Sequence, residues 1–181
     1  MKTGEKGFTL IELLIAIPIA ALVMLAASGA LIQLVQSGNA SANMAAIRQA
    51  QGAGFWVSRD GLQAKNVIIG PTSDDLCIFE WTDDTAEEAP VRIRYSWVLM
   101  STSSGQLWKL QRQQTVGGVS PTTTTMIVAT NLFKDGNASA LYWTDNYTKD
   151  SFRFQVTSRV SQKTCVRTYE VTPRPEGSIS G

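Results

Sequence analysis

The chain has 181 residues, with 16 basic and 15 acidic side chains, no histidine and two cysteines. This length accommodates one domain plus an appended segment. The balanced charge gives no indication of a nucleic-acid surface, because phosphate binding needs clustered Lys and Arg. Without histidine, the commonest general base and metal ligand is missing, so neither a catalytic triad nor a zinc site is predicted.

The N-terminus combines a short charged leader with a long apolar run. Residues 1–7 are polar and too short to fold, and their two lysines favour retention on the cytoplasmic side of a membrane. Glu12 is then the single charge before Arg48. Residues 13–32 are twenty consecutive uncharged and mostly apolar residues, which is the length of a membrane-spanning helix. A carboxylate beside such a run is expensive to bury and indicates a function.

One helix is predicted from about residue 8 to residue 64, roughly 85 Å at 1.5 Å per residue. Pro18 predicts a kink or a local opening, since it lacks an N–H and clashes with the preceding turn. Gly29 is a second point at which the helix can yield, or at which another helix can approach closely. The second half of this helix is predicted to dock on a sheet. The predicted docking stripe consists of four apolar residues near one face of the helix: Met44, Ile47, Phe55 and Leu62.

After Asn66 the apolar period changes to two, which is typical of strands. The clearest strand covers 91–99 and forms a predicted hairpin with 107–112. A second hairpin joins 152–157 to 165–171 through a turn near 158–163. Shorter strands are predicted at 67–69, 76–81, 125–129 and 140–144, with loops including 82–90 and 117–125. The fold class is therefore α+β, a long N-terminal helix on a mostly antiparallel sheet.

The two cysteines, Cys77 and Cys165, form no CxxC pair. In a cytosolic protein they would be two buried thiols. In an exported domain a disulfide is the other reading, and the chain-entropy estimate for so long a loop is about 4.5 kcal/mol.

Two sets of residues, one acidic and one aromatic, could have either a functional or a structural role. The acids flanking one predicted strand could bind calcium, but a solvated acidic loop is favoured because their spacing matches no EF-hand; they are Asp74, Asp75, Asp83, Asp84, Glu87 and Glu88. The aromatic residues could form a carbohydrate platform, but core packing and strand faces are favoured; they are Trp56, Trp81, Trp97, Trp108, Tyr142 and Trp143. No cofactor and no catalytic set is predicted.

The stretch Gly7-Phe8-Thr9-Leu10-Ile11-Glu12, followed by the apolar run, closely resembles the class III signal of type IV pilins and type II secretion pseudopilins. The resemblance implies the type IV pilin-like fold. It also implies cleavage after Gly7 by a prepilin peptidase, N-methylation of the new N-terminal Phe8, and a role for Glu12 in assembly. A buried carboxylate seeks a positive partner, which the N-terminal amine of a neighbouring subunit can supply.

A weaker resemblance points to a subclass. Residues 50–67, with the sequence Arg59-Asp60-Gly61-Leu62, look like the end of the long helix in J-type minor pseudopilins and PilW-like minor pilins, although the inserted Gly61 departs from their pattern. The hairpin formed by 93–95 and 107–112 also resembles that group. The implied protein is a non-enzymatic minor subunit at or near the tip of a type IV pilus or a type II secretion pseudopilus.

This interpretation divides the chain into a leader (1–7), a transmembrane and filament-core helix (8–32), the extramembrane half of that helix (33–65) and a β-rich domain with a flexible tail (66–181). The implied partners are other subunits, the prepilin peptidase, the assembly platform with its ATPase, and the inner membrane. The N-terminus would lie inside and the domain outside. The alternatives are a major pilin acting in adhesion or DNA uptake, and a membrane-anchored binding domain that does not polymerise.

Overall fold

The computed structural model describes residues 9–70, 72–82, 90–100, 106–117, 120–134, 139–145 and 148–174. It contains one long helix, α1 (Leu10–Gln63), and an antiparallel sheet that packs on it. The chain forms two compact units, Met1–Ser41 and Ala42–Gly181, so α1 contributes to both. The predicted α+β, pilin-like arrangement is confirmed, as is the single helix, which runs through Pro18 and Gly29 without interruption.

Eight strands follow the helix: β1 (Asn66–Ile69), β2 (Asp75–Thr82), β3 (Pro90–Met100), β4 (Leu107–Val116), β5 (Thr122–Leu132), β6 (Ala140–Trp143), β7 (Phe152–Val160) and β8 (Lys163–Val171). The order is β1-β2-β3-β4-β5-β7-β6, and β8 pairs with β7. Both predicted hairpins are confirmed, β3 with β4 and β7 with β8. The predicted loop at 117–125 is wrong at its end, because the β-branched threonines from Thr122 onward pair with β4.

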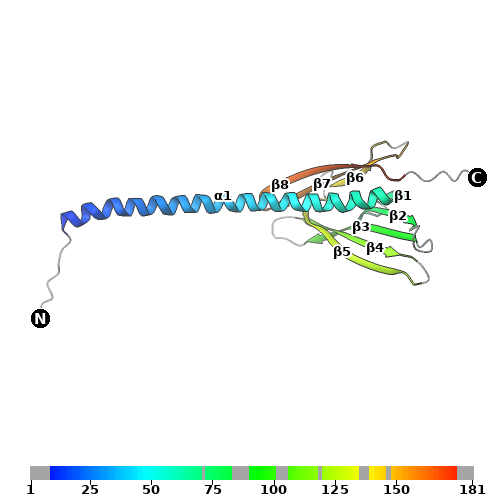
Figure 1. Ribbon diagram of the computed structural model, residues 1–181, viewed down its shortest axis with the longest axis horizontal. Helices are drawn as coiled ribbons and strands as arrows, with labels where there is room; N and C mark the ends of the chain where they lie inside the picture. The colour runs from blue at the N-terminus through cyan, green and yellow to red at the C-terminus, as the bar shows by residue number, and fades with distance from the viewer. Residues whose placement is uncertain are drawn as a thin grey trace, which may run out of the picture. The chain divides into compact units, whose positions relative to one another are not determined.

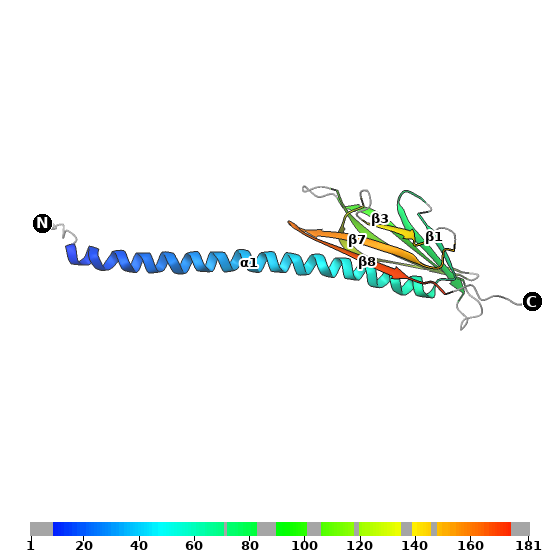
Figure 2. The same ribbon diagram turned by 90° about the horizontal axis from the view of Figure 1, so that it is seen from above.

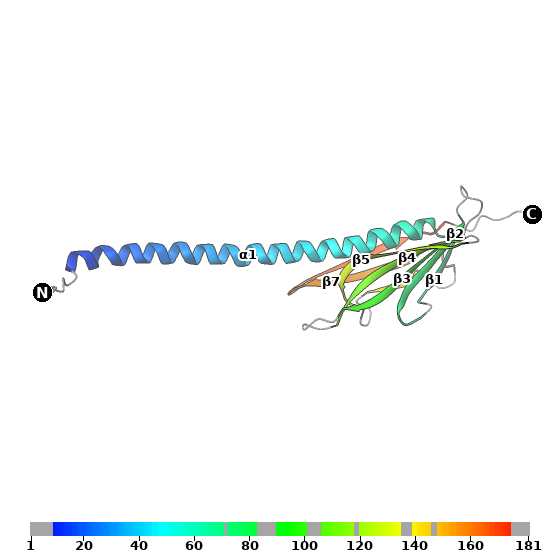
Figure 3. The same ribbon diagram turned by 90° about the horizontal axis from the view of Figure 1, so that it is seen from below.

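In the second unit the sheet curls around the end of α1. Figures 2 and 3 show the sheet on one side of the helix, and Figure 1 shows β7 and β8 along one flank with β3, β4 and β5 along the other. β8 pairs with β7 over its whole length and with no other described strand, so its outer edge is free. β5 meets β7 at one pair, Leu132 with Ser158, so the sheet is joined weakly at this point.

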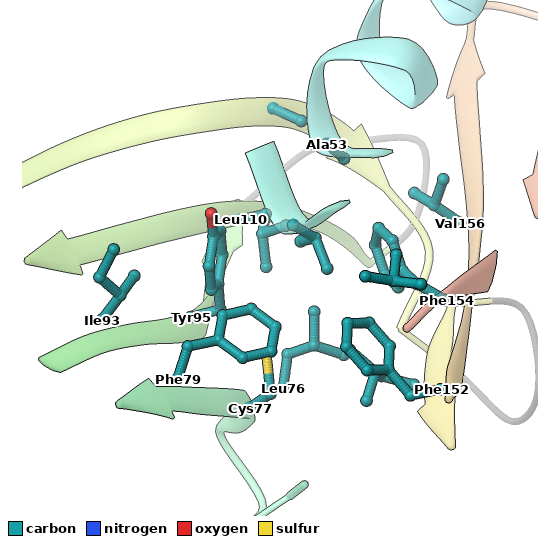
Figure 4. Packing of buried hydrophobic residues seen from close by; sticks show 14 of the residues in the cluster. Ala53, Leu76, Cys77, Phe79, Ile93, Tyr95, Leu110, Phe152, Phe154 and Val156 are labelled. Atoms are coloured by element: carbon teal, nitrogen blue, oxygen red, sulfur yellow. The ribbon is translucent and has the colours of Figure 1, made fainter. Parts of the chain in front are cut away.

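The core joins small side chains of the helix to large side chains of the sheet. The buried helix residues are Ala46, Ala50, Ala53, Gly54, Val57, Asp60 and Gly61. The sheet supplies the aromatic rings, and Figure 4 shows Phe79, Tyr95, Phe152 and Phe154 gathered near Ala53. Gly54 and Gly61 allow this close approach. A Cβ on Gly54 would meet the Tyr169 ring, and one on Gly61 would lie 2.5 Å from Phe152.

The predicted docking stripe is wrong for three of its four residues, while Ile47 is half-buried. Met44, Phe55 and Leu62 are 56%, 58% and 55% exposed, and they lie on the face of α1 that the sheet leaves uncovered. The helix packs through its smallest side chains instead, because small residues let the sheet's rings come close to the helix backbone. The core preference for the tryptophans is confirmed. Trp97 is buried, and Trp56, Trp81, Trp108 and Trp143 pack against the core.

A buried carboxylate anchors the helix to the sheet. Asp60 is 2% exposed and accepts hydrogen bonds from Arg112 on β4, Nε to Oδ2 at 2.6 Å and Nη2 to Oδ1 at 3.1 Å. The Tyr95 hydroxyl on β3 donates to Oδ2 at 2.5 Å. Trp56 covers Arg112, whose guanidinium carbon lies 5.2 Å from the ring centroid. The carboxylate is thus fully paired, as a buried charge must be.

The ionisation states fit this arrangement. Burial, and then the charge of Asp60, raise the pKa of the Tyr95 hydroxyl well above its ordinary value, so it remains a donor. Burial acts to lower the pKa of Arg112, but its hydrogen bond to Asp60 and the charge of that carboxylate outweigh this effect and raise the pKa.

Two further polar contacts fix the helix against β5 and β7. The Gln49 side-chain oxygen accepts the Thr130 N–H at 2.7 Å, next to Asn131, whose φ is 56°. The Ser158 hydroxyl donates to the Ala46 carbonyl at 2.5 Å. Gln49 therefore satisfies a strand N–H where the β4–β5 register is irregular.

Removing Asp60 should unfold the domain more readily than removing any surface charge. We expect Asp60→Ala to lower the free energy of unfolding by about 3–5 kcal/mol, because it leaves Arg112 buried and unpaired. Tyr95→Phe removes one hydrogen bond to a charged group and should cost about 1.5–3 kcal/mol. Denaturant unfolding of the full chain in micelles measures both. Arg153→Ala, from the exposed Arg153–Glu170 pair, is the control and should cost less than about 1 kcal/mol.

The close approach at Gly54 gives a second test. Gly54→Ala places a Cβ against the Tyr169 ring and should lower the free energy of unfolding by about 1–3 kcal/mol. Gly38→Ala, where a Cβ meets nothing within 4 Å, should have no destabilising effect, because alanine favours the helix by about 1 kcal/mol. Equal unfolding midpoints for the two variants would contradict the proposed contact.

Candidate functional site

The N-terminal part of α1 is a bare apolar helix. Every described residue from Thr9 to Ser41 is exposed. Its large side chains include Leu10, Leu14 and Leu25, which are 82%, 64% and 70% exposed. In the described part of the chain, α1 is the one helix long and apolar enough to span a membrane. So much uncovered apolar surface needs lipid or protein around it.

Glu12 and Thr9 form a reciprocal cap at the start of α1. The Glu12 carboxylate accepts the Thr9 N–H at 2.9 Å and the Thr9 hydroxyl at 2.8 Å. The Thr9 hydroxyl oxygen in turn accepts the Glu12 N–H at 3.4 Å. This is a capping box, in which a threonine and a glutamate three residues later satisfy free N–H groups at a helix start. Glu12 therefore has local partners in the single chain.

Four other residues of this segment were predicted to act in processing or in helix bending, and the structure describes two of them. Gly7 and Phe8 lie outside the described residues. Pro18 lies inside α1, and a Cβ at Gly29 would meet nothing within 4 Å. Nearby, the Ser28 hydroxyl donates to the Met24 carbonyl at 2.8 Å, so this turn satisfies its own polar side chain. The yielding roles of Pro18 and Gly29 stay predictions.

The two cysteines are free in the structure. Cys77 on β2 is fully buried in the core, whereas Cys165 on β8 is partly exposed. Burial, with the nearby charges of Asp60 and Asp75, raises the pKa of the Cys77 thiol well above its ordinary value. The sequence left two interpretations open, a pair of thiols or a disulfide. The structure contains two thiols and no Cys77–Cys165 bridge.

The predicted solvated acidic loop is correct for Asp74, whose side chain is 74% exposed and lies 3.4 Å from Lys134, and wrong for Asp75. Asp75 was expected in a solvated acidic loop, but it begins β2, is 5% exposed and binds Arg94 through two hydrogen bonds of 2.6 and 2.8 Å. This contact holds the pKa of the Asp75 carboxyl below its ordinary value. Asp83, Asp84, Glu87 and Glu88 lie outside the described residues. Among the side chains that are described, no group of three acids or cysteines could hold a metal ion.

Sequence reasoning missed the roles of Asp60, Arg112 and Tyr95, which the fold brings together from three elements. It also missed the cap, although the spacing Thr-x-x-Glu at residues 9–12 is a known helix-start signal. Asp60 carries a weaker signal. An acid in the last turn of a helix is unfavourable to the helix dipole and calls for a compensating partner.

Comparison with known proteins gives one match, and it falls on this segment. Residues 2–28 match the family described as the prokaryotic N-terminal methylation motif. No curated protein and no solved structure matches the chain. The matched range contains residues 2–7 of the predicted leader, the Thr9–Glu12 cap and most of the exposed apolar run. The motif and the long apolar helix together support a type IV pilin-like N-terminal signal that anchors the chain in a membrane.

Proposed function

We propose that the chain is a structural minor subunit of a type IV pilus or a type II secretion pseudopilus, placed at or near the filament tip. The observation that carries the proposal is a methylation motif that leads directly into an uncovered apolar helix. In the membrane, lipid covers this helix. In a filament, the helices of other subunits cover the same side chains, so one surface serves both states.

Processing and delivery follow from this role. The prepilin peptidase cuts after Gly7, and Phe8 becomes the methylated N-terminus. The subunit waits in the inner membrane, N-terminus inside and domain outside, until the platform protein and its ATPase move it into the filament. The J-type or PilW-like subclass rests on the Arg59-Asp60-Gly61-Leu62 stretch. That stretch contains the buried anchor Asp60, which the domain needs for packing. Gly61, the residue that departs from the subclass pattern, is tightly packed as well.

The role of Glu12 in assembly needs its charge as well as its cap. In the single chain the carboxylate is exposed and bound to Thr9. When helices pack into a dry filament core, a carboxylate without a cationic partner becomes costly. The amine of the processed Phe8 on a neighbouring subunit would supply that partner. Pairing would then favour one axial position between adjacent helices.

Mass spectrometry of the mature protein tests the processing step. The expected N-terminal peptide begins at Phe8 and carries one added methyl group. The same cells without prepilin peptidase should retain Met1. A mature chain that still begins at Met1 in cells with active peptidase would rule the processing out.

Two variants separate the charge of Glu12 from its capping role. Glu12→Gln keeps a side chain that suits the capping box but removes the charge. We expect it to reduce assembled filaments at least about tenfold, which corresponds to about 1.4 kcal/mol. Thr9→Ala keeps the charge and loses the hydroxyl cap, at a cost of about 1 kcal/mol to the helix start. It should still assemble.

Immunoblots of sheared filaments measure assembly, and mass spectrometry checks that both variants are processed. If Glu12→Gln assembles normally while Thr9→Ala does not, Glu12 acts as a helix cap alone. Dominance of this chain among the sheared subunits would favour a major pilin over a minor one.

A further inference from the structure

A cavity of about 640 Å³ lies at the end of the domain where α1 stops. Four segments line it: residues 65–67 after α1, Trp143 at the end of β6, residues 148–150, and residues 172–174 after β8. Figure 1 shows the ends of α1, β6 and β8 at this end of the domain. The volume falls within the range of about 300–1,000 Å³ that small-molecule sites occupy.

The lining is cationic. Lys65, Lys149 and Arg174 are basic, and Asp150 is the one acidic residue of the lining. Lys149 and Arg174 are exposed, and the five ion pairs between described residues include neither. Their charges are therefore available to an anionic group, with which they can form charge-assisted hydrogen bonds.

Local structure holds Lys149 in place. Its φ is 54°, a left-handed conformation that is uncommon for a residue with a side chain. The Lys149 N–H donates to the Asp145 carbonyl at 3.1 Å, and the Thr148 hydroxyl donates to the Asp145 carboxylate at 3.3 Å. Backbone strain of this kind persists where the surroundings require it, and it clusters at binding sites.

Trp143 adds a partly buried aromatic ring to the lining. It packs edge-on against the buried ring of Phe152, with centroids 6.3 Å apart and an interplanar angle of 84°. A ring fixed in this way offers an apolar face at low entropic cost. Beside it, the Thr172 hydroxyl can hydrogen-bond a ligand. The Thr148 hydroxyl donates to Asp145 and the Asn66 amide donates to Glu80, so each of these two side chains offers a ligand an acceptor oxygen.

Asp150 distinguishes between the anions that could enter. A carboxylate repels a bare phosphate and the closely spaced phosphates of a nucleic acid. It accepts hydrogen bonds from hydroxyl groups, however, so it suits a ligand that carries both hydroxyls and a negative charge. An aromatic ring, threonines, one acid and the two exposed cations Lys149 and Arg174 together match the C–H face, the hydroxyls and the carboxylate of an acidic sugar.

We propose that this cavity binds an acidic saccharide of one to three rings. Arg174 and Lys149 hold the sugar carboxylate, Asp150 and the threonines bind its hydroxyls, and Trp143 packs against the ring. The proposal does not rest on filament assembly, because every lining residue belongs to the second unit, Ala42–Gly181. It gives the subunit a capacity to attach to an acidic glycan.

Titration calorimetry on the full chain tests the proposal, in a detergent without a sugar headgroup. The probe is digalacturonate, and its methyl ester is the matched uncharged ligand. We expect digalacturonate to bind and the ester to bind at least about tenfold more weakly. Arg174→Ala and Trp143→Ala should each weaken digalacturonate about tenfold. Arg48→Ala removes an exposed arginine outside the lining and should change nothing.

Asp150→Asn is the decisive variant. If the carboxylate accepts sugar hydroxyls, this variant weakens digalacturonate. If the cavity is a simple anion site, it strengthens binding, and inorganic phosphate competes with the sugar; that result overturns the proposal. Absence of digalacturonate binding overturns it as well, as does tighter binding of a single-stranded oligonucleotide.

Thermal unfolding checks that each variant remains folded. Should Trp143→Ala unfold, the test stands on Arg174→Ala, which changes an exposed side chain. Filament yield should be unchanged in Arg174→Ala. A loss of filaments without any sugar binding would make this surface a subunit contact instead.

Discussion

The packing of α1 on the sheet depends on the ion pair between Asp60 and Arg112, which Tyr95 completes. An acid is a poor choice for the last turn of a helix, and burial makes it worse. Both costs disappear only when the helix places Asp60 against β3 and β4 in one position. Buried pairs contribute little net stability compared with apolar packing, but breaking one is costly. A pair of this kind favours one position of the helix on the sheet over others.

The remaining interface follows from that position. The helix turns its alanines and glycines toward the aromatic rings of the sheet, which leaves Met44, Phe55 and Leu62 on the outside. Before residue 42 the large apolar side chains are also uncovered. The single chain thus satisfies its buried polar anchor internally but leaves an extensive apolar helix surface without a partner. Such a surface is typical of a protein that completes its packing by association.

Periodicity was sufficient to predict the helix and all eight strands, because alternation and long apolar runs are local properties. Periodicity did not predict which face of α1 packs on the sheet, because Ala50, Ala53 and Gly54 contribute almost nothing to a hydrophobic pattern. These residues are buried because their small side chains let the sheet come close. The partners of Asp60 are 35 and 52 residues away in sequence, so no local pattern could connect them. The motif at residues 7–12 was readable, whereas the cavity at 65–67, 143, 148–150 and 172–174 exists only after folding.

The free edge of β8 has a consequence for how the domain behaves while it is still alone. The unpaired outer edge of this nine-residue strand could recruit a strand from a second copy and start an aggregate. The edge carries Lys163, Arg167 and Glu170, and its central residues 166–168 are exposed. Charges and exposed polar groups on an edge strand oppose this kind of pairing. The domain can therefore be kept at high local concentration, with its association left to the helix rather than to the sheet.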